Sequence, residues 1–211
     1  MRKSDVSFAV IRRLPRYLRH LAMLEQQGIA RISSKELAER MDVTASQIRQ
    51  DFNCFGCFGQ QGYGYNIKTL IDQLFNIMGV TRNYRAILIG VGNIGHALLN
   101  NFNFQKRGFD LIGAFDCAPG LIGTTVNGYP VLDVASVDRF VAERHPDIAI
   151  LSVPASAVHE LAEQLSHAGV RGFWNFTNHE LNLSDRSLPV ENVHFSDSLL
   201  TLCYRLGEKE M

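Results

Sequence analysis

Apolar positions in the first part of the chain recur at helical spacing and predict three short helices. The first is expected from Pro15 to Gln27, just before Gly28, a residue typical of helix ends. The other two are expected at 34–41 and 45–52, because each follows a capping-box pattern, Ser33-x-x-Glu36 and Thr44-x-x-Gln47. Only a tight turn fits between these two helices. This is the layout of a helix-turn-helix, whose second helix enters the DNA major groove.

A glycine-rich segment with interleaved aromatic residues, 56–65, follows and predicts a hairpin. A hairpin directly after a recognition helix is the wing of a winged-helix domain. Residues 66–78 then carry a helical apolar stripe that Gly79 closes, and residues 81–83 look like a linker. We therefore expect residues 1–80 to form a winged helix-turn-helix DNA-binding domain.

The rest of the chain alternates apolar strands with amphipathic helices. Strands are predicted at 85–89, 109–116, 148–153 and 172–177, with helices at 93–105, 134–144 and 155–168. Buried strands that alternate with helices form a parallel, doubly wound sheet of the Rossmann type, so the fold class is α/β. Residues 81–195 are expected to form this domain. A last apolar stripe predicts a separate C-terminal helix within 196–211.

The zero net charge of the chain hides an asymmetry. Residues 1–80 hold 11 Lys and Arg against 7 Asp and Glu, whereas residues 81–211 hold 10 against 14. A basic first domain favours a polyanionic partner such as DNA, although a solvated basic surface would carry the same charge.

Composition also bears on compartment and metal chemistry. The sequence shows no signal peptide and no apolar run long enough to span a membrane, so we expect a cytoplasmic protein without membrane contact. The four cysteines are too few for a disulfide framework. Cys54 and Cys57 form one C-x-x-C without the second pair of a structural zinc site, and neighbouring phenylalanines indicate packing. We expect no metal, and a redox role for these two thiols stays open.

The predicted strand at 85–89 runs directly into the dinucleotide-binding pattern G-x-G-x-x-G, here Gly90-Val91-Gly92-Asn93-Ile94-Gly95. In this pattern Gly90 allows a tight turn, Gly92 lets a pyrophosphate approach the backbone, and Gly95 allows close packing of helix on strand. The N-terminus of the following helix offers free N–H groups and a partial positive charge to the phosphates. The alternative is a tight turn without a ligand.

Asp116 ends the second predicted strand at the distance from the glycine motif that the dinucleotide fingerprint requires. A carboxylate there accepts hydrogen bonds from ribose hydroxyls and repels a 2′-phosphate, which selects NAD(H) over NADP(H). Val153 and Pro154, at the end of the strand predicted at 148–153, are expected to complete the cofactor site. The alternative for Asp116 is a cap at the end of its strand.

A cofactor site alone does not make a dehydrogenase. The residues after the linker suffice for the cofactor fold but leave no room for a substrate domain. The best acid–base candidates, His159-Glu160 and His179-Glu180, are expected at the surface, so we expect no catalytic residues and a sensor of NADH/NAD⁺. Two alternatives stay open: a small NAD-dependent oxidoreductase with a basic accessory domain, and a DNA-binding regulator that senses another nucleotide or a CoA ester.

Over nearly its whole length the chain resembles the Rex family of redox-sensing repressors. The resemblance rests on an ordered series of motifs: Arg13-Leu14-Pro15-x-Tyr17-Leu18-Arg19, Ile32-Ser-Ser-Lys-Glu-Leu-Ala38, Val43-Thr44, Gln47-Ile-Arg49-x-Asp51, Phe55-Gly56, Gly62-x-Gly64-Tyr65, Gly92-Asn93-Ile94-Gly95-x-Ala97-Leu98-Leu99, Asn175-Phe176 and Val190-Glu191-Asn192-Val193. So many motifs in one order are hard to obtain by chance.

The resemblance implies a homodimer whose C-terminal helix swaps onto the partner subunit. It also implies an inverted-repeat operator in double-stranded DNA, with one recognition helix in each half-site and a wing in the minor groove. NADH, at a high NADH/NAD⁺ ratio, would close the dimer and release the DNA. By position, the implied contacts of the recognition helix are Ser46, Gln47, Arg49 and Gln50. The implied phosphate contacts beside it are Ser33, Ser34, Lys35 and Thr44, and those of the wing are Gln61, Tyr63 and Tyr65.

The chain departs from the family pattern at several of these positions. Gln50 replaces a usual Lys, and Gln60-Gln61 replaces a basic pair, so we expect DNA binding that is weaker and less dependent on salt. Asn101 and His194 replace the usual Tyr and Asp in the region that couples cofactor to dimer closure. A histidine there would make the switch sensitive to pH, with a plain surface histidine as the alternative. The implied switch and dimer residues are Arg19, Asn101, His194 and Phe195.

Overall fold

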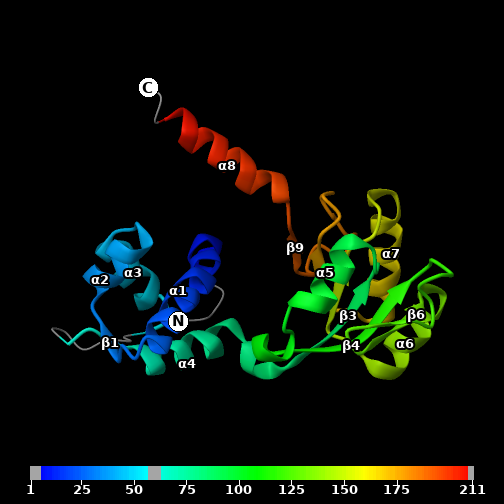
Figure 1. Cartoon of the computed structure of the whole chain (residues 1–211), viewed down its shortest axis with the longest axis horizontal. Coiled ribbons are helices and arrows are strands. Elements are labelled where there is room, and N and C mark those ends of the chain that lie inside the picture. The colour runs from blue at the N-terminus through cyan, green and yellow to red at the C-terminus, as the bar shows by residue number, and fades with distance from the viewer. Residues whose placement is uncertain (1–5, 57–62, 209–211) are drawn as a thin grey trace. The chain divides into compact units, whose positions relative to one another are not determined.

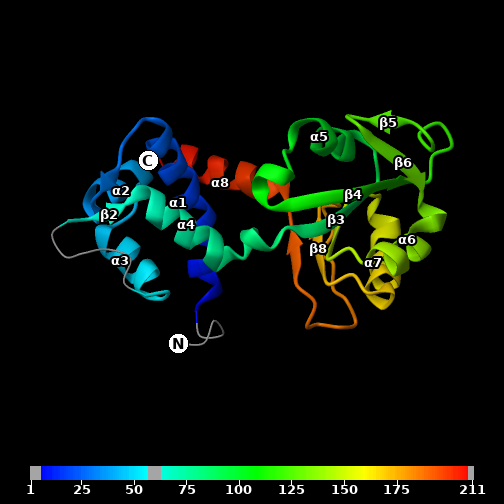
Figure 2. The same cartoon turned by 90° about the horizontal axis from the view of Figure 1, so that it is seen from below.

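The computed structural model describes residues 6–56 and 63–208, and it divides into two compact units at residues 82 and 83. The α-helices and strands of the first unit are α1 (Phe8–Gln26), β1 (Arg31–Ile32), α2 (Ser34–Met41), α3 (Ala45–Asn53), β2 (Tyr65–Asn66) and α4 (Ile67–Met78) (Figure 1). The packing of α1 against α4 and of α2 against α3 encloses one apolar core (Figure 2). The apolar residues expected to face that core are buried in it: Leu37, Ala38, Met41, Ile48 and Phe52.

The capping pattern predicted for α2 is present in full, and that of α3 only in part. The Ser33 hydroxyl accepts from the Glu36 N–H at 3.1 Å, and the Glu36 carboxylate accepts from the Ser33 N–H at 2.8 Å. At α3 the Thr44 hydroxyl accepts from the Gln47 N–H at 3.1 Å. The Gln47 side chain does not return to Thr44, because its amide donates to Asp51 instead.

The predicted start of the first helix was wrong, since α1 begins at Phe8 and contains Pro15. Ser7 caps the helix by accepting from the Ala9 N–H at 3.3 Å. A proline inside a helix removes one hydrogen bond, and here the apolar stripe that runs across it keeps the helix in place. Leu14 and Tyr17, on either side of Pro15, are fully buried.

The predicted hairpin at 56–65 lies partly outside the described residues. The strand pairing that the structure describes here is antiparallel and joins Ile32 to Tyr65, so β2 pairs with the strand that precedes α2. Gly64 has a φ of +68°, and a Cβ on it would lie 2.6 Å from the Ile32 carbonyl oxygen. A glycine is therefore required where the chain meets β1.

The second unit has the predicted doubly wound sheet, in the strand order β5-β6-β4-β3-β7-β8-β9. Its strands are β3 (Tyr84–Ile89), β4 (Phe109–Asp116), β5 (Thr125–Val126), β6 (Tyr129–Asp133), β7 (Ile148–Leu151), β8 (Gly172–Asn175) and β9 (Val190–Asn192). All pairings are parallel except β5 with β6. This α/β fold corrects the expectation in three places, because β5, β6 and β9 were not predicted.

Three helices of the second unit cover the two faces of the sheet, and a fourth helix follows its last strand. They are α5 (Asn93–Asn101), α6 (Val137–Arg144), α7 (Ala155–Ala168) and α8 (Phe195–Gly207). One apolar core lies under α6 and α7 and the other under α5, on the opposite face (Figure 2). The helix expected at 93–105 ends at Asn101, because Phe102 leaves the helical conformation and packs against Trp174. No residue of α8 is buried.

Candidate functional site

The strand order of the second unit reverses between β3 and β7. In a doubly wound sheet, the carboxyl ends of the two strands at this point form the usual nucleotide site. Here β3 ends in the loop of residues 90–95, and β7 is followed by Ser152, Val153 and Pro154. The predicted cofactor-binding residues other than Asp116 therefore follow the two strands that flank the reversal.

The three glycines of the loop have different surroundings. Gly90 has a φ of +92°, and a Cβ on it would lie 2.5 Å from the Ser152 carbonyl oxygen. A Cβ on Gly95 would lie 2.0 Å from the Gly90 carbonyl oxygen. A Cβ on Gly92 would meet no described atom within 4 Å. Packing therefore requires Gly90 and Gly95, whereas Gly92 leaves open space of the kind that a pyrophosphate needs.

The start of α5 has the electrostatics of an anion site. The described chain provides no side-chain cap for this helix, whose N-cap residue is Gly92. The N–H groups of Asn93, Ile94 and Gly95 thus belong to the first turn, where a helix leaves donors without intrahelical partners. These donors and the helix dipole favour a phosphate group.

Asp116 lies at the end of β4, next to the same loop. Its carboxylate accepts from the Val91 N–H at 2.6 Å and from the Ala118 N–H at 2.8 Å. The residue therefore caps its strand, which was the alternative reading, and also holds the glycine loop. A carboxylate has about four acceptor positions, so it retains capacity for ribose hydroxyls.

Ser152 was missed by the sequence analysis, which placed it inside a strand. Its hydroxyl donates to the Gly90 carbonyl oxygen at 2.7 Å. This bond fixes the first glycine of the loop to the neighbouring strand end. Val153 lies beside the same glycine, and Pro154 precedes α7, which has no side-chain cap in the described chain.

The recognition helix α3 presents three predicted DNA contacts to solvent, namely Ser46, Arg49 and Gln50. The Arg49 guanidinium donates to the Ser34 hydroxyl at 3.0 Å, which joins α3 to the start of α2. Gln47 is half-buried and bonded to Asp51. The flanking residues Lys35 and Thr44 are exposed, and Ser33 and Ser34 are half-buried.

The wing residues divide into three cases. Gln61, like its neighbour Gln60, lies outside the described residues. Tyr63 is 71% exposed and is available to a partner. Tyr65 was expected to contact DNA, but it is only 8% exposed, and its ring packs edge-on against Phe52 with centroids 5.2 Å apart. Its place in β2 turns the side chain into the core, so it is not a surface contact.

Asp51 lies on α3, and its sequence motif predicted no role for it. Its side chain is 1% exposed, and the Arg13 guanidinium donates to both carboxylate oxygens at 2.6 and 2.7 Å. The Tyr17 hydroxyl donates to it at 2.6 Å and the Gln47 amide at 2.8 Å. Burial by itself raises the pKa of the Asp51 carboxyl, but these hydrogen bonds outweigh burial and hold the pKa below its usual value. The carboxylate is therefore ionised on the buried side of the recognition helix.

The implied switch residues lie in both units. Arg19 is exposed on α1, in the first unit, and Asn101 is exposed at the end of α5, in the second. His194 precedes α8, and its ring nitrogens lie 3.1 Å from a Glu180 carboxylate oxygen and 3.3 Å from the Asn178 amide oxygen. A histidine at this position is thus held by residues that follow β8 in its own chain.

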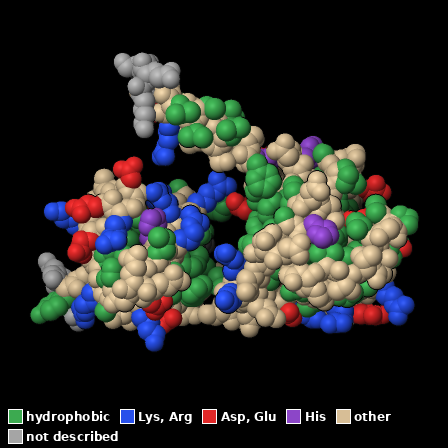
Figure 3. Space-filling model, viewed as in Figure 1, with side chains coloured by type: hydrophobic (Ala, Val, Ile, Leu, Met, Phe, Trp, Pro, Cys, Tyr) green, Lys and Arg blue, Asp and Glu red, His purple; other side chains and the backbone are tan. Residues whose placement is uncertain are grey.

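Helix α8 carries an apolar surface. Phe195, Leu199, Leu202 and Leu206 repeat at helical spacing, and each is more than half exposed. Figure 3 shows hydrophobic side chains along this helix. Exposed apolar surface of this kind marks an interaction site.

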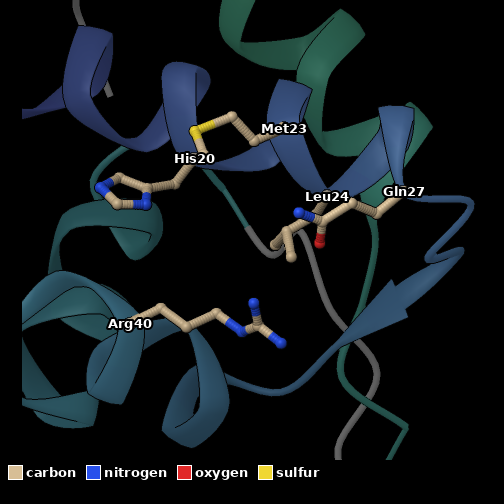
Figure 4. Close-up of a pocket in the computed structure, with 5 residues that line it drawn as sticks. All are labelled: His20, Met23, Leu24, Gln27 and Arg40. Carbon is tan, nitrogen blue, oxygen red and sulfur yellow. The ribbon is translucent and has the colours of Figure 1, made fainter.

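A hollow of about 240 Å³ lies between α1 and α2. Figure 4 shows that its lining comes from the end of α1 and from Arg40 of α2, where the α1 side contributes His20, Met23, Leu24 and Gln27. Burial, Arg16 and Arg19 lower the pKa of His20. None of the predicted site residues lines this hollow.

Within residues 6–56 and 63–208, no three His, Cys, Asp or Glu side chains are grouped as a metal site would require. None of the helices in these residues has the length and apolar character needed to cross a membrane. Cys54 is free, and Cys57 lies outside the described residues.

Comparison with protein-family models agrees with the division into two parts. Residues 5–53 match the family described as "Putative DNA-binding protein N-terminus". Residues 81–179 match the family described as "CoA binding domain". The first match covers the helix-turn-helix, and the second covers the glycine loop and Asp116.

Curated relatives and solved structures match nearly the whole chain. The redox-sensing transcriptional repressor Rex of Caldanaerobacter subterraneus is 51% identical over 100% of this chain and 93% of its own. The repressor of that name from Clostridium acetobutylicum is 49% identical over 98% and 96%. RSP, a Rex-family repressor, superposes with a TM-score of 0.89 both in complex with beta-NAD+ and operator DNA and in complex with beta-NADH. These two complexes show 49% and 46% identity and cover 97% and 98% of this chain, and 94% and 96% of their own. The chain therefore belongs to the Rex family of redox-sensing transcriptional repressors.

Proposed function

We propose that this chain represses transcription by binding an inverted-repeat operator through α3 and leaves the operator when NADH binds between β3 and β7. The observation that supports this most is the open space at Gly92, beside an uncapped helix start and the Asp116 carboxylate. Those groups match a diphosphate joined to a ribose. A solved relative, RSP, is in complex with beta-NAD+ and operator DNA in one structure and with beta-NADH in another.

A dinucleotide would contact the start of α5 and the residues that end β4 and follow β7. Asn93, Ile94 and Gly95 would hold the diphosphate through their N–H groups. Asp116 would accept from the ribose hydroxyls and disfavour a 2′-phosphate. The nicotinamide would end near Val153 and Pro154. When bound, the nucleotide serves as a sensed ligand, so the chain acts as a regulator and carries out no catalytic step.

The active form that we propose is a homodimer in the cytoplasm, without a metal ion. An inverted repeat has twofold symmetry, which a twofold dimer matches with one recognition helix in each half-site. The exposed stripe of α8 supports a swapped arrangement, because a second copy of the chain would cover it. The proposed location follows from the partners, since the chain must meet both chromosomal DNA and NADH.

A second candidate keeps the DNA-binding role and replaces NADH by a CoA ester. The match of residues 81–179 to a CoA-binding family favours it. Both ligands carry a diphosphate, so the glycine loop suits either. They differ at the sugar, because CoA bears a 3′-phosphate on its ribose, which the Asp116 carboxylate would repel.

Selection of binding duplexes from a random-sequence DNA library, with the full chain, tests the proposal. We expect one inverted-repeat duplex to be enriched. Fluorescence anisotropy of that duplex should then report its release by NADH, but not by NAD⁺, NADPH or CoA at the same concentration. Release by CoA alone would establish the second candidate. Failure to enrich any duplex would contradict DNA recognition.

The substitution Asp116→Ala tests the ribose contact. We expect it to weaken NADH binding about tenfold, the effect of losing one hydrogen bond to a charged group. Energy transfer from Trp174, the single tryptophan, to the reduced nicotinamide measures the affinity. Asp110→Ala is the matched control, because Asp110 is exposed at the other end of β4. Equal affinities of the two variants would mean that Asp116 makes no ribose contact.

The substitution Leu199→Glu tests the dimer. Leu199 lies in the middle of the α8 apolar stripe and both copies carry the change, so a charge there should weaken self-association by at least the order of 30-fold, the loss expected for one buried leucine. Thr201→Glu, on the polar side of the same helix, should leave it unchanged. Sedimentation equilibrium against the chain mass of 23.7 kDa gives the result. A variant as dimeric as the wild type would show that α8 is not the interface.

A further inference from the structure

Asp51 is the one charged side chain that is fully buried in the described residues. A buried carboxylate is costly unless it is paired and its remaining acceptors are used. Here four hydrogen bonds from three side chains serve it, two of them from one guanidinium. Such a bidentate contact between a guanidinium and a carboxylate fixes the relative orientation of the two groups as well as their distance.

The partners of Asp51 come from two helices. Arg13 and Tyr17 are one turn apart on α1, whereas Gln47 is one turn before Asp51 on α3 itself. The Tyr17 ring also packs edge-on against Phe52 of α3, with centroids 5.1 Å apart. Two adjacent positions of α3 are thus held by α1, which restrains rotation of the recognition helix about its axis.

Gln47 occupies a position at which a base contact is expected. To read adenine, glutamine uses its amide oxygen and one amide N–H together. Here the Gln47 amide donates to Asp51 at 2.8 Å, and its side chain is half-buried. Turning it toward DNA would remove a donor from a buried carboxylate, which is costly.

We propose that Arg13, Tyr17 and Gln47 form a brace on Asp51 that sets the orientation of α3, and that Gln47 is a positioning residue and reads no base. This proposal rests on the proposed DNA-binding role of α3. The base-reading set of that helix is then Ser46, Arg49 and Gln50, the three exposed candidates. The brace acts on DNA affinity through the angle at which these side chains project.

Operator affinity of the full-length variants Gln47→Ala and Asp51→Asn, and of the double variant, tests the brace as a double-mutant cycle. A residue that acts through Asp51 loses its effect once Asp51 is changed, whereas independent effects add. We expect Gln47→Ala to weaken binding about tenfold, in line with one hydrogen bond to a charged group. The double variant should bind no more weakly than Asp51→Asn alone. Should Asp51→Asn fail to fold by circular dichroism, Arg13→Gln takes its place in the cycle.

A base-pair scan of the operator separates positioning from reading. Positioning predicts that Gln47→Ala weakens binding to every substituted duplex by the same factor. A reader would instead lose discrimination at one base pair. Loss of discrimination at one base pair would overturn the proposal. So would additive effects in the cycle, or no effect of Gln47→Ala on any duplex. Wild-type binding to the operator remains intact in all three cases, so the DNA-binding role is judged separately.

Discussion

Gly92→Val is expected to abolish the response to NADH while leaving the fold and operator binding unchanged. The φ and ψ of Gly92, −72° and −161°, are extended and open to any residue. A Cβ there meets no described atom within 4 Å, so the substitution should not strain the protein. The branched side chain would fill the space in which a diphosphate approaches the first turn of α5. Loss of two or more charge-assisted hydrogen bonds should weaken NADH binding at least about 100-fold.

Energy transfer from Trp174 gives the affinity, and anisotropy of a labelled operator gives the release. The internal control is operator affinity without nucleotide, which should stay at the wild-type value. Gly95→Ala provides the contrast, because a Cβ there lies 2.0 Å from a backbone oxygen and should lower the melting temperature. If Gly92→Val binds NADH as the wild type does, the diphosphate does not lie over this loop.

Arg49→Ala should abolish specific binding to the operator. Arg49 is exposed on α3, and arginine to guanine is the commonest specific contact in the major groove. Each such contact contributes about 1–3 kcal/mol, and a dimer loses it in both half-sites. We therefore expect affinity to fall at least about 30-fold. Anisotropy with operator and with scrambled duplex separates lost specificity from lost charge.

Arg40→Ala is the matched control for Arg49→Ala. Arg40 is an exposed arginine of the same unit, but it lies on α2 and lines the hollow against α1 (Figure 4). Its loss removes one positive charge and no base contact, so binding to operator and to scrambled duplex should fall by the same small factor. An equal loss for both variants would mean that Arg49 acts only through its charge.

Sequence reasoning was most successful where a single segment carries the pattern. The parallel strands, the loop at 90–95 and the capping box at Ser33 are local features, and the structure contains each of them. The hairpin of β5 and β6 was equally local but was overlooked. Its turn is Asn127-Gly128, with φ of 48° and 84°, which is the strongest short hairpin pattern.

Other features depend on contacts between distant segments. Arg13 and Asp51 are 38 residues apart, and nothing in the spacing of either indicates that they pair. The burial of Tyr65 follows from the pairing of β2 with β1, which the sequence does not reveal. Pro15 misled the prediction of α1 because the local preference of proline for the first helical turn was overruled by packing on both sides of it.

A crystal structure of the full chain grown with NADH tests the central claim most directly. We expect the diphosphate against the N–H groups of residues 93–95 and the adenosine ribose on the Asp116 carboxylate. A site between β3 and β7 that stays empty at saturating NADH, or a nucleotide bound elsewhere in the chain, would contradict NADH sensing by this domain.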